Sequence, residues 1–151
     1  MTGPERALHH VSNVLVAGTG LVYAWMIYLV TPEDPFALAN HPWQPEFQSA
    51  HLLFAPLLIF AVGYSWQSHV WMRLRFRFPH KRRTGICLFA LFLPMVLSGY
   101  GLQVAVGETL RATWLWMHGI SSGLWVLFYL IHWILPGPKL EGTDLCFPED
   151  D

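Results

Sequence analysis

Eight histidines are the residues of this 151-residue chain most able to do chemistry, because most of them lie where charged side chains are otherwise missing. Six fall in or at the ends of stretches without Asp, Glu, Lys or Arg: His9, His10, His51, His69, His118 and His132. Imidazole is a common metal ligand, and ionisable groups inside apolar stretches are costly enough to indicate function. We therefore take these six as candidate metal ligands.

The spacing of these histidines suits two flat metal cofactors stacked one above the other. His118 and His132 would lie about 21 Å apart along one helix and about 40° out of register, so they share a face. The small residues of Gly119–Gly123 between them would let a macrocycle lie against the backbone. His51 and His69 also share a face, about 27 Å apart. Two stacked haems across a membrane need about this separation.

Four stretches without charged residues must form the elements that position the histidines: 7–32, 47–72, 84–107 and 112–138. Each exceeds the roughly 20 apolar residues that span a hydrocarbon core. Lipid admits only helices or closed barrels, and the stretches do not alternate as strands would. We predict an all-α integral membrane four-helix bundle, a single domain over residues 1–151. The predicted spans are about Val11–Val30, Ala50–Met72, Gly85–Val106 and Thr113–Leu135.

Composition and charge placement agree with this prediction and also predict how the helices are oriented in the membrane. The chain is 54% hydrophobic and 13% charged, against about 25% charged for a soluble domain. The segment Arg73–Arg83 (RLRFRFPHKRR) holds six of the nine basic residues, so the positive-inside rule places it in the cytoplasm. Both termini are then cytoplasmic, and the loop Thr31–Ser49 and the turn Gly107–Ala112 face the periplasm. Lipid is thus a predicted partner, and nothing indicates nucleic acid.

The predicted topology pairs two histidines at the outer side of the membrane. The second and fourth helices run in the same direction, and His51 and His118 both lie near their outer ends. These two residues are natural axial ligands of one outer haem. A zinc site is less well supported than haem, because the histidines divide between two leaflets and neither Cys nor carboxylate joins them.

The inner side leaves more than one pairing open. His132 is the natural first ligand, and its partner is His9 or His10 at the start of the first helix, or His69 at the end of the second. His69 lies about one helical turn too deep, unless that helix tilts or kinks, for example at Pro56.

This pattern resembles the four-helix, di-haem cytochrome b subunits that anchor membrane-bound formate dehydrogenases and nickel–iron hydrogenases. It is also similar to small free-standing bacterial di-haem b cytochromes, over about residues 6–135. In that group the first-helix histidine often follows an arginine as R-x-x-H, which Arg6–His9 matches. The resemblance implies that His51 and His118 bind the outer haem, and that the first-helix histidine and His132 bind the inner one. His69 has no clear counterpart in the pattern.

The resemblance implies a b-type cytochrome in a bacterial cytoplasmic membrane that exchanges electrons with quinone. Its second partner would be periplasmic, a multi-haem cytochrome or a metalloenzyme subunit. The chain has no Cys-x-x-Cys-His for covalent haem attachment, so two haems b are expected. Haem propionates are anionic and favour cations at their rim, and Arg111 is placed to meet the outer haem.

Two other functions compete with an electron-transfer subunit. One is a stand-alone di-haem oxidoreductase, for example a superoxide:quinone enzyme. The other is a non-redox structural subunit or small transporter whose histidines pack or relay protons. The sequence contains no nucleotide motif and no further catalytic apparatus, which favours the electron-transfer subunit over a stand-alone enzyme.

Overall fold

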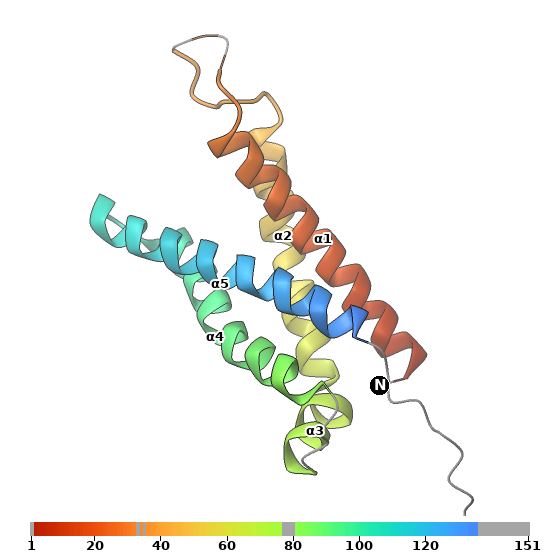
Figure 1. Cartoon of the computed structure of the whole chain (residues 1–151). Coiled ribbons are helices and arrows are strands. Elements are labelled where there is room, and N and C mark those ends of the chain that lie inside the picture. The colour runs from red at the N-terminus through yellow and green to blue at the C-terminus, as the bar shows by residue number, and fades with distance from the viewer. Residues whose placement is uncertain (1, 33, 35, 77–80, 136–151) are drawn as a thin grey trace, which may run out of the picture.

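The computed structural model describes residues 2–32, 34, 36–76 and 81–135, and every regular element within these ranges is helical (Figure 1). Four helices are long and apolar enough to cross a membrane: α1 (Gly3–Tyr28), α2 (Gln44–Tyr64), α4 (Arg82–Val104) and α5 (Glu108–Ile134). The π-helix η1 (Trp66–Trp71) and the short α3 (Met72–Arg75) follow α2. The all-α architecture and the presence of four helices able to cross a membrane are therefore confirmed.

Some predicted features are not tested by the structure. The middle of the basic loop, with His80, lies outside the described residues, and so do Glu33 and the chain after Leu135. The orientation with both termini in the cytoplasm stays a prediction.

The first helix begins well before the predicted Val11, because polar residues cap it. Thr2 Oγ1 accepts a hydrogen bond from the Glu5 backbone N–H at 3.4 Å, and the Glu5 carboxylate accepts one from the Thr2 backbone N–H at 2.6 Å. This reciprocal capping box satisfies two N–H groups at a helix start that would otherwise lack partners. The helix therefore extends beyond its apolar stretch.

The connection between α4 and α5 is shorter than predicted. Only Ala105–Gly107 separate the two helices, because α5 begins at Glu108 rather than at Thr113. Gly107 has a φ of 95°, which is accessible to glycine without strain. The turn can therefore reverse the chain within this short segment.

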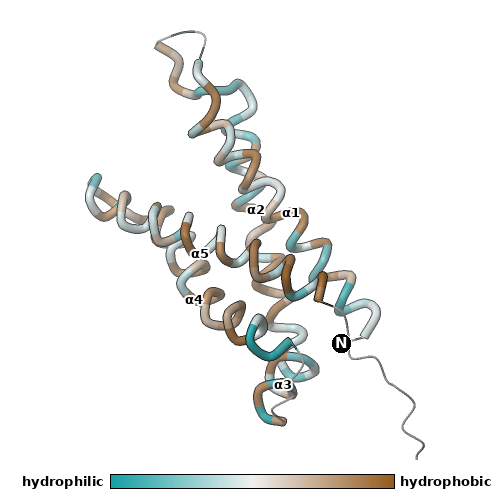
Figure 2. The backbone as a smooth tube through the Cα atoms, in the orientation of Figure 1, coloured by the Kyte–Doolittle hydropathy of each residue, from teal (hydrophilic) through white to brown (hydrophobic). Residues whose placement is uncertain are grey.

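The four long helices form two antiparallel hairpins. Helix α1 packs along α2, α4 packs along α5, and close backbone contacts between the hairpins are few among the described residues. In Figure 1 the hairpins converge near α3 and diverge toward their opposite ends. Figure 2 shows hydrophilic residues gathered at the first turn of α4, at the converging end. Any site shared by the two hairpins must therefore be built from side chains that bridge them.

A small apolar cluster joins the hairpins between their ends. Leu58 and Val62 of α2 pack with Met95 of α4 and Trp125 of α5. The Trp125 indole N–H also donates a hydrogen bond to the buried Asn13 side-chain oxygen on α1, at 2.9 Å. All four helices therefore meet at this cluster.

Asn13→Ala is expected to lower stability by about 1 kcal/mol, the usual size of a hydrogen bond between membrane helices. The variant leaves the Trp125 indole N–H buried without its acceptor, which lowers the Tm measured by thermal unfolding in detergent. The double variant Asn13→Ala/Trp125→Phe should lose less than the sum of the single variants, because both remove the same bond. Additive losses would show that the two residues act independently.

Candidate functional site

Four of the six candidate histidines form two facing pairs, and each pair takes one ring from each hairpin. His51 on α2 faces His118 on α5, with ring centres 6.1 Å apart and planes at 74°. His69 in η1 faces His132 on α5, with centres 6.2 Å apart and planes at 85°. We call these the outer pair and the inner pair, after the predicted orientation. Of the three alternatives left open for the partner of His132, the structure places His69 opposite it.

The separation within each pair suits one metal ion between the two rings. An imidazole nitrogen binds a metal at about 2.0 Å, and the ring centre lies about 1 Å behind it, so two opposed ligands put their centres about 6 Å apart. Within the described residues, no group of three or more His, Cys, Asp or Glu could hold a metal ion. Haem iron needs only two axial protein ligands, because its macrocycle supplies the other donors. Paired histidines therefore fit haem better than zinc.

In the outer pair, His51 is held against α1 in the tautomer that a metal ligand needs. Its Nδ1 lies 3.0 Å from the Val16 carbonyl oxygen. A carbonyl only accepts, so Nδ1 carries the hydrogen and Nε2 keeps its lone pair. The ring packs so closely on Gly20 that a Cβ there would lie 2.8 Å from the His51 Cε1. Helix α1 thus fixes both the depth and the protonation of this ring.

His118 is held against α4 in the same way. Its Nδ1 donates to the Met95 carbonyl oxygen at 3.1 Å, and Ser98 Oγ lies 3.3 Å from the same nitrogen. A Cβ at Gly99 would lie 3.2 Å from the His118 Cε1. Both rings of the outer pair therefore keep Nε2 available.

The rings of the outer pair pack against α1 and α4, and these two helices carry the same short pattern of residues at the contact. Each presents a carbonyl, then a hydroxyl residue three positions later, then a glycine. On α1 the hydroxyl and the glycine are Thr19 and Gly20, and on α4 they are Ser98 and Gly99. We call such a pair a hydroxyl–glycine step.

His132 of the inner pair rests on a third hydroxyl–glycine step, Thr84–Gly85. Its Nδ1 lies 2.8 Å from Thr84 Oγ1, and that hydroxyl donates its own hydrogen to the Lys81 carbonyl oxygen at 3.0 Å. A hydroxyl has one hydrogen to give, so the His132 Nδ1–H must be the donor. A Cβ at Gly85 would lie 3.7 Å from the His132 Cε1, an ordinary contact. Nε2 of this ring is also left available.

His69 lies in the π-helical segment η1. By α-helical rise alone it would lie about one turn too deep to meet His132. The helix passes through Pro56 and changes type only at Trp66–Trp71. A π-helical segment changes both rise and register, and such segments are frequent at functional sites. A constant α-helical rise disfavours the pairing of His69 with His132. The pairing therefore coincides with a local change from α-helix to π-helix.

The other two candidates, His9 and His10, have different partners. His9 Nε2 lies 2.6 Å from Ser65 Oγ, whose hydrogen goes to the Ala61 carbonyl at 3.1 Å, so Nε2 donates and is occupied. His10 Nδ1 is hydrogen-bonded to the Tyr129 hydroxyl. The resemblance implied a first-helix ligand for the inner haem, whereas the structure places neither histidine opposite His132.

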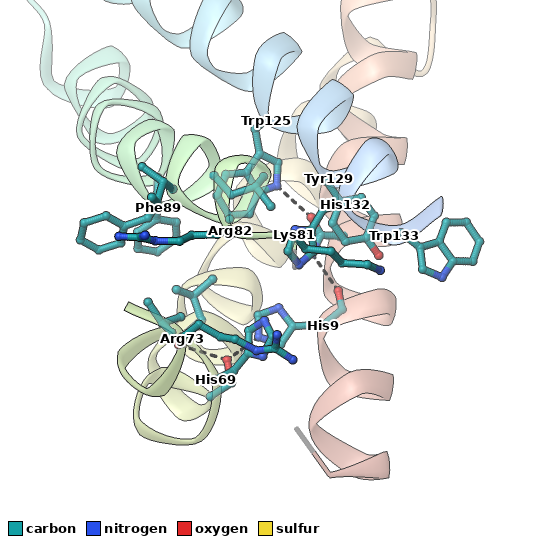
Figure 3. Close-up of a pocket in the computed structure, with 18 of the residues that line it drawn as sticks. His9, His69, Arg73, Lys81, Arg82, Phe89, Trp125, Tyr129, His132 and Trp133 are labelled. Carbon is teal, nitrogen blue, oxygen red and sulfur yellow. Dashed lines mark hydrogen bonds between the residues drawn. The ribbon is translucent and has the colours of Figure 1, made fainter. Parts of the chain in front are cut away.

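A cavity of about 420 Å³ surrounds the inner pair, a size typical of cofactor pockets. Figure 3 shows the side chains of Arg73, Lys81 and Arg82 around it, and Arg6 also lines it. Aromatic side chains provide much of the remaining wall: Phe89, Phe92, Trp125, Tyr129 and Trp133. Cations at the rim of an apolar pocket suit a flat ligand that carries carboxylates.

The outer side is more open. Arg111, the predicted cation for the outer haem, donates its guanidinium to the Leu102 carbonyl oxygen at 3.4 Å. It lies about two turns from His118 along α5, and its propionate role stays a prediction. A Cβ added at Gly119 or Gly123 would meet nothing within 4 Å. Both glycines are exposed, and the packing of a macrocycle against them stays a prediction.

The hydroxyl–glycine steps were not predicted from the sequence, because the glycines were interpreted only as room for a macrocycle. A signal was available. The spacing between Thr84–Gly85 and Ser98–Gly99 equals the spacing between His118 and His132. An antiparallel hairpin brings such equally spaced positions face to face.

Comparisons with known protein families, curated proteins and solved structures find no match for this chain. The function of the chain must therefore be inferred from its residues and their geometry.

Proposed function

We propose that the chain is a b-type cytochrome subunit that passes electrons between the quinone pool and a periplasmic redox partner. The observation that carries the proposal is the pair of imidazole separations, 6.1 and 6.2 Å, each bridging the two hairpins. His51 and His118 would hold an outer haem b, and His69 and His132 an inner one. Haem with two histidine ligands supplies one-electron transfer and leaves no open coordination position for oxygen chemistry.

The chain itself would orient the histidine ligands and surround the two sites with apolar residues. The Val16 and Met95 carbonyls and the Thr84 hydroxyl hold three of the four rings with Nε2 available. The two histidines on α5 lie about 21 Å apart, so one site falls in each half of the membrane. In a membrane, the apolar helices and the surrounding lipid would limit water at both sites, which would reduce the reorganisation that accompanies electron transfer.

The periplasmic partner is proposed from the loop between α1 and α2. Phe36 is 91% exposed, Leu38 is fully exposed and Trp43 is 65% exposed. The His41 ring lies between Trp25 and Trp43. Aromatic residues are enriched in protein interfaces, which supports docking on the side of the outer pair.

Quinone is proposed as the mobile partner because the inner cavity has hydrogen-bonding groups besides its ligand pair. His9, His10 and Tyr129 line the same cavity as His69 and His132. The hydrogen bond between His10 and Tyr129 joins α1 to α5 across the hairpins. Because His9 Nε2 is committed to Ser65, the quinone head group would use the remaining hydrogen-bonding capacity of the His10–Tyr129 pair.

The purified chain is expected to contain two haems b, with a Soret band and a low-spin spectrum. Two opposed imidazole pairs can ligate two irons, and a histidine pair leaves each iron saturated. Pyridine haemochrome analysis against protein concentration gives the stoichiometry. A colourless protein purified from haem-replete cells would contradict both redox functions and favour a non-redox structural subunit.

A second measurement separates the electron-transfer subunit from a stand-alone oxidoreductase. The subunit is expected to co-purify with a periplasmic cytochrome or metalloenzyme and to be reduced by a quinol. A chain that purifies alone and turns over superoxide would favour the stand-alone enzyme instead.

A further inference from the structure

The two histidine pairs differ in what accepts the Nδ1 hydrogen. In the outer pair, both rings donate to main-chain carbonyl oxygens, those of Val16 and Met95. In the inner pair, His132 donates to the Thr84 hydroxyl. Among the residues that the structure describes, no hydrogen bond reaches the ring nitrogens of His69. The two pairs therefore differ in the kind of acceptor: the outer rings donate to main-chain carbonyls, and His132 donates to a hydroxyl.

Such hydrogen bonds control how strongly an imidazole donates to a metal. Donation from Nδ1–H to an acceptor makes Nε2 more basic and fixes the ring orientation. A more basic ligand stabilises ferric over ferrous iron and lowers the reduction potential. An amide carbonyl is a stronger hydrogen-bond acceptor than a hydroxyl, because delocalisation from the amide nitrogen enriches its oxygen in electron density. The acceptors alone would therefore place the outer site at the lower potential.

Charges near the inner pair act in the same direction. Arg6, Arg73, Lys81 and Arg82 line the inner cavity. Nearby cations disfavour the more positive ferric state, and in an apolar surrounding this effect is screened less than in water. Arg111 lies at the opposite end of α5 and contacts the Leu102 carbonyl. The charges thus reinforce the difference that the acceptors create.

We propose that Thr84 is a positioning residue that fixes His132 as an Nδ1–H donor, and that the two sites differ in potential, with the outer one lower. The inference rests on the proposed function, because it requires haem at both pairs. Thr84–Gly85, the hydroxyl–glycine step in the first turn of α4, thereby gains a role, and the two sites gain an order of potentials.

Thr84→Val tests the proposal, because it keeps the branched shape of the side chain and removes the acceptor. Potentiometric titration of wild type is expected to show two components, of which His118→Ala removes the lower and His132→Ala the higher. In Thr84→Val the higher component should shift to still higher potential while the lower one stays in place. Thr84→Ser, which restores the hydroxyl, should return the shifted component to its original position.

Thr113→Val is the matched control, because within the described part of the chain the Thr113 hydroxyl bonds only to the Thr109 carbonyl of its own helix. An equal shift in this variant, an unshifted Thr84→Val or a failure of Thr84→Ser to restore the potential would overturn the role of Thr84. Loss of the inner haem in Thr84→Val but not in Thr84→Ser would support it. Should Thr84→Val fail to fold, titration of His118→Ala still decides the order of the two sites, because loss of the higher component in that variant would contradict the proposal. A wild type that contains no haem would instead defeat the proposed function.

Discussion

His69→Ala is expected to remove the inner haem and halve the haem content, whereas His9→Ala should keep both haems. The His69 ring centre lies 6.2 Å from that of His132, while His9 uses its Nε2 to donate to Ser65. Without His69, the inner iron would have only one protein ligand. Haem stoichiometry measures the loss, and low-temperature spectra show whether one low-spin species remains.

His9→Ala serves as the matched control, because it removes an imidazole that lines the same cavity. It loses the bond to Ser65 and is expected to lower the Tm slightly without changing haem content. The opposite result, with haem lost from His9→Ala and kept in His69→Ala, would restore the pairing that the resemblance implies. Loss of haem from both variants would show that neither histidine is dispensable to the site.

Gly20→Ala is expected to abolish the outer haem, with an effect as large as removal of a ligand. The new Cβ would lie 2.8 Å from the His51 Cε1 and 3.0 Å from its Nδ1, closer than packing permits. The ring must move away from α1, which breaks its bond to the Val16 carbonyl and misplaces Nε2. Gly18→Ala is the control, since a Cβ at Gly18 meets nothing within 4 Å. Haem content is measured in both variants.

The other hydroxyl–glycine steps give this prediction a graded series. Gly99→Ala, with a Cβ 3.2 Å from the His118 Cε1, should weaken haem retention partially. Gly85→Ala, with its contact of 3.7 Å to His132, should be tolerated. Wild-type haem content in Gly20→Ala, or equal losses in all three variants, would show that ring packing does not control haem binding.

The spans and the outer pair could be predicted because they depend on simple physical rules. Missing charges mark the segments that can cross lipid, and the structure has long helices at all four. His51 and His118 lie near the same ends of helices that run in the same direction, so helical rise alone aligns them. The ends of the helices were less predictable, because the capping box of Thr2 and Glu5 extends α1 into polar sequence.

The inner pair could not be predicted, because it depends on a local change of helix type. Counting at a constant rise left His69 about one turn too deep for His132, and the resemblance favoured His9. Neither composition nor hydropathy marks Trp66–Trp71 as π-helical. Only the three-dimensional structure shows that His9 is committed to Ser65 and that His69 faces His132.

Under the proposed function, the division into two hairpins would give the paired histidines a second role, in assembly. Each hairpin supplies one histidine to each facing pair, while few backbone contacts join the hairpins directly among the described residues. A group bound by both hairpins stabilises only the assembled state, so its binding free energy adds to the stability of that state. Cofactor supply would then control how much mature protein accumulates. Chains made during haem shortage would remain as two loosely associated halves, accessible to membrane proteases until haem joins them.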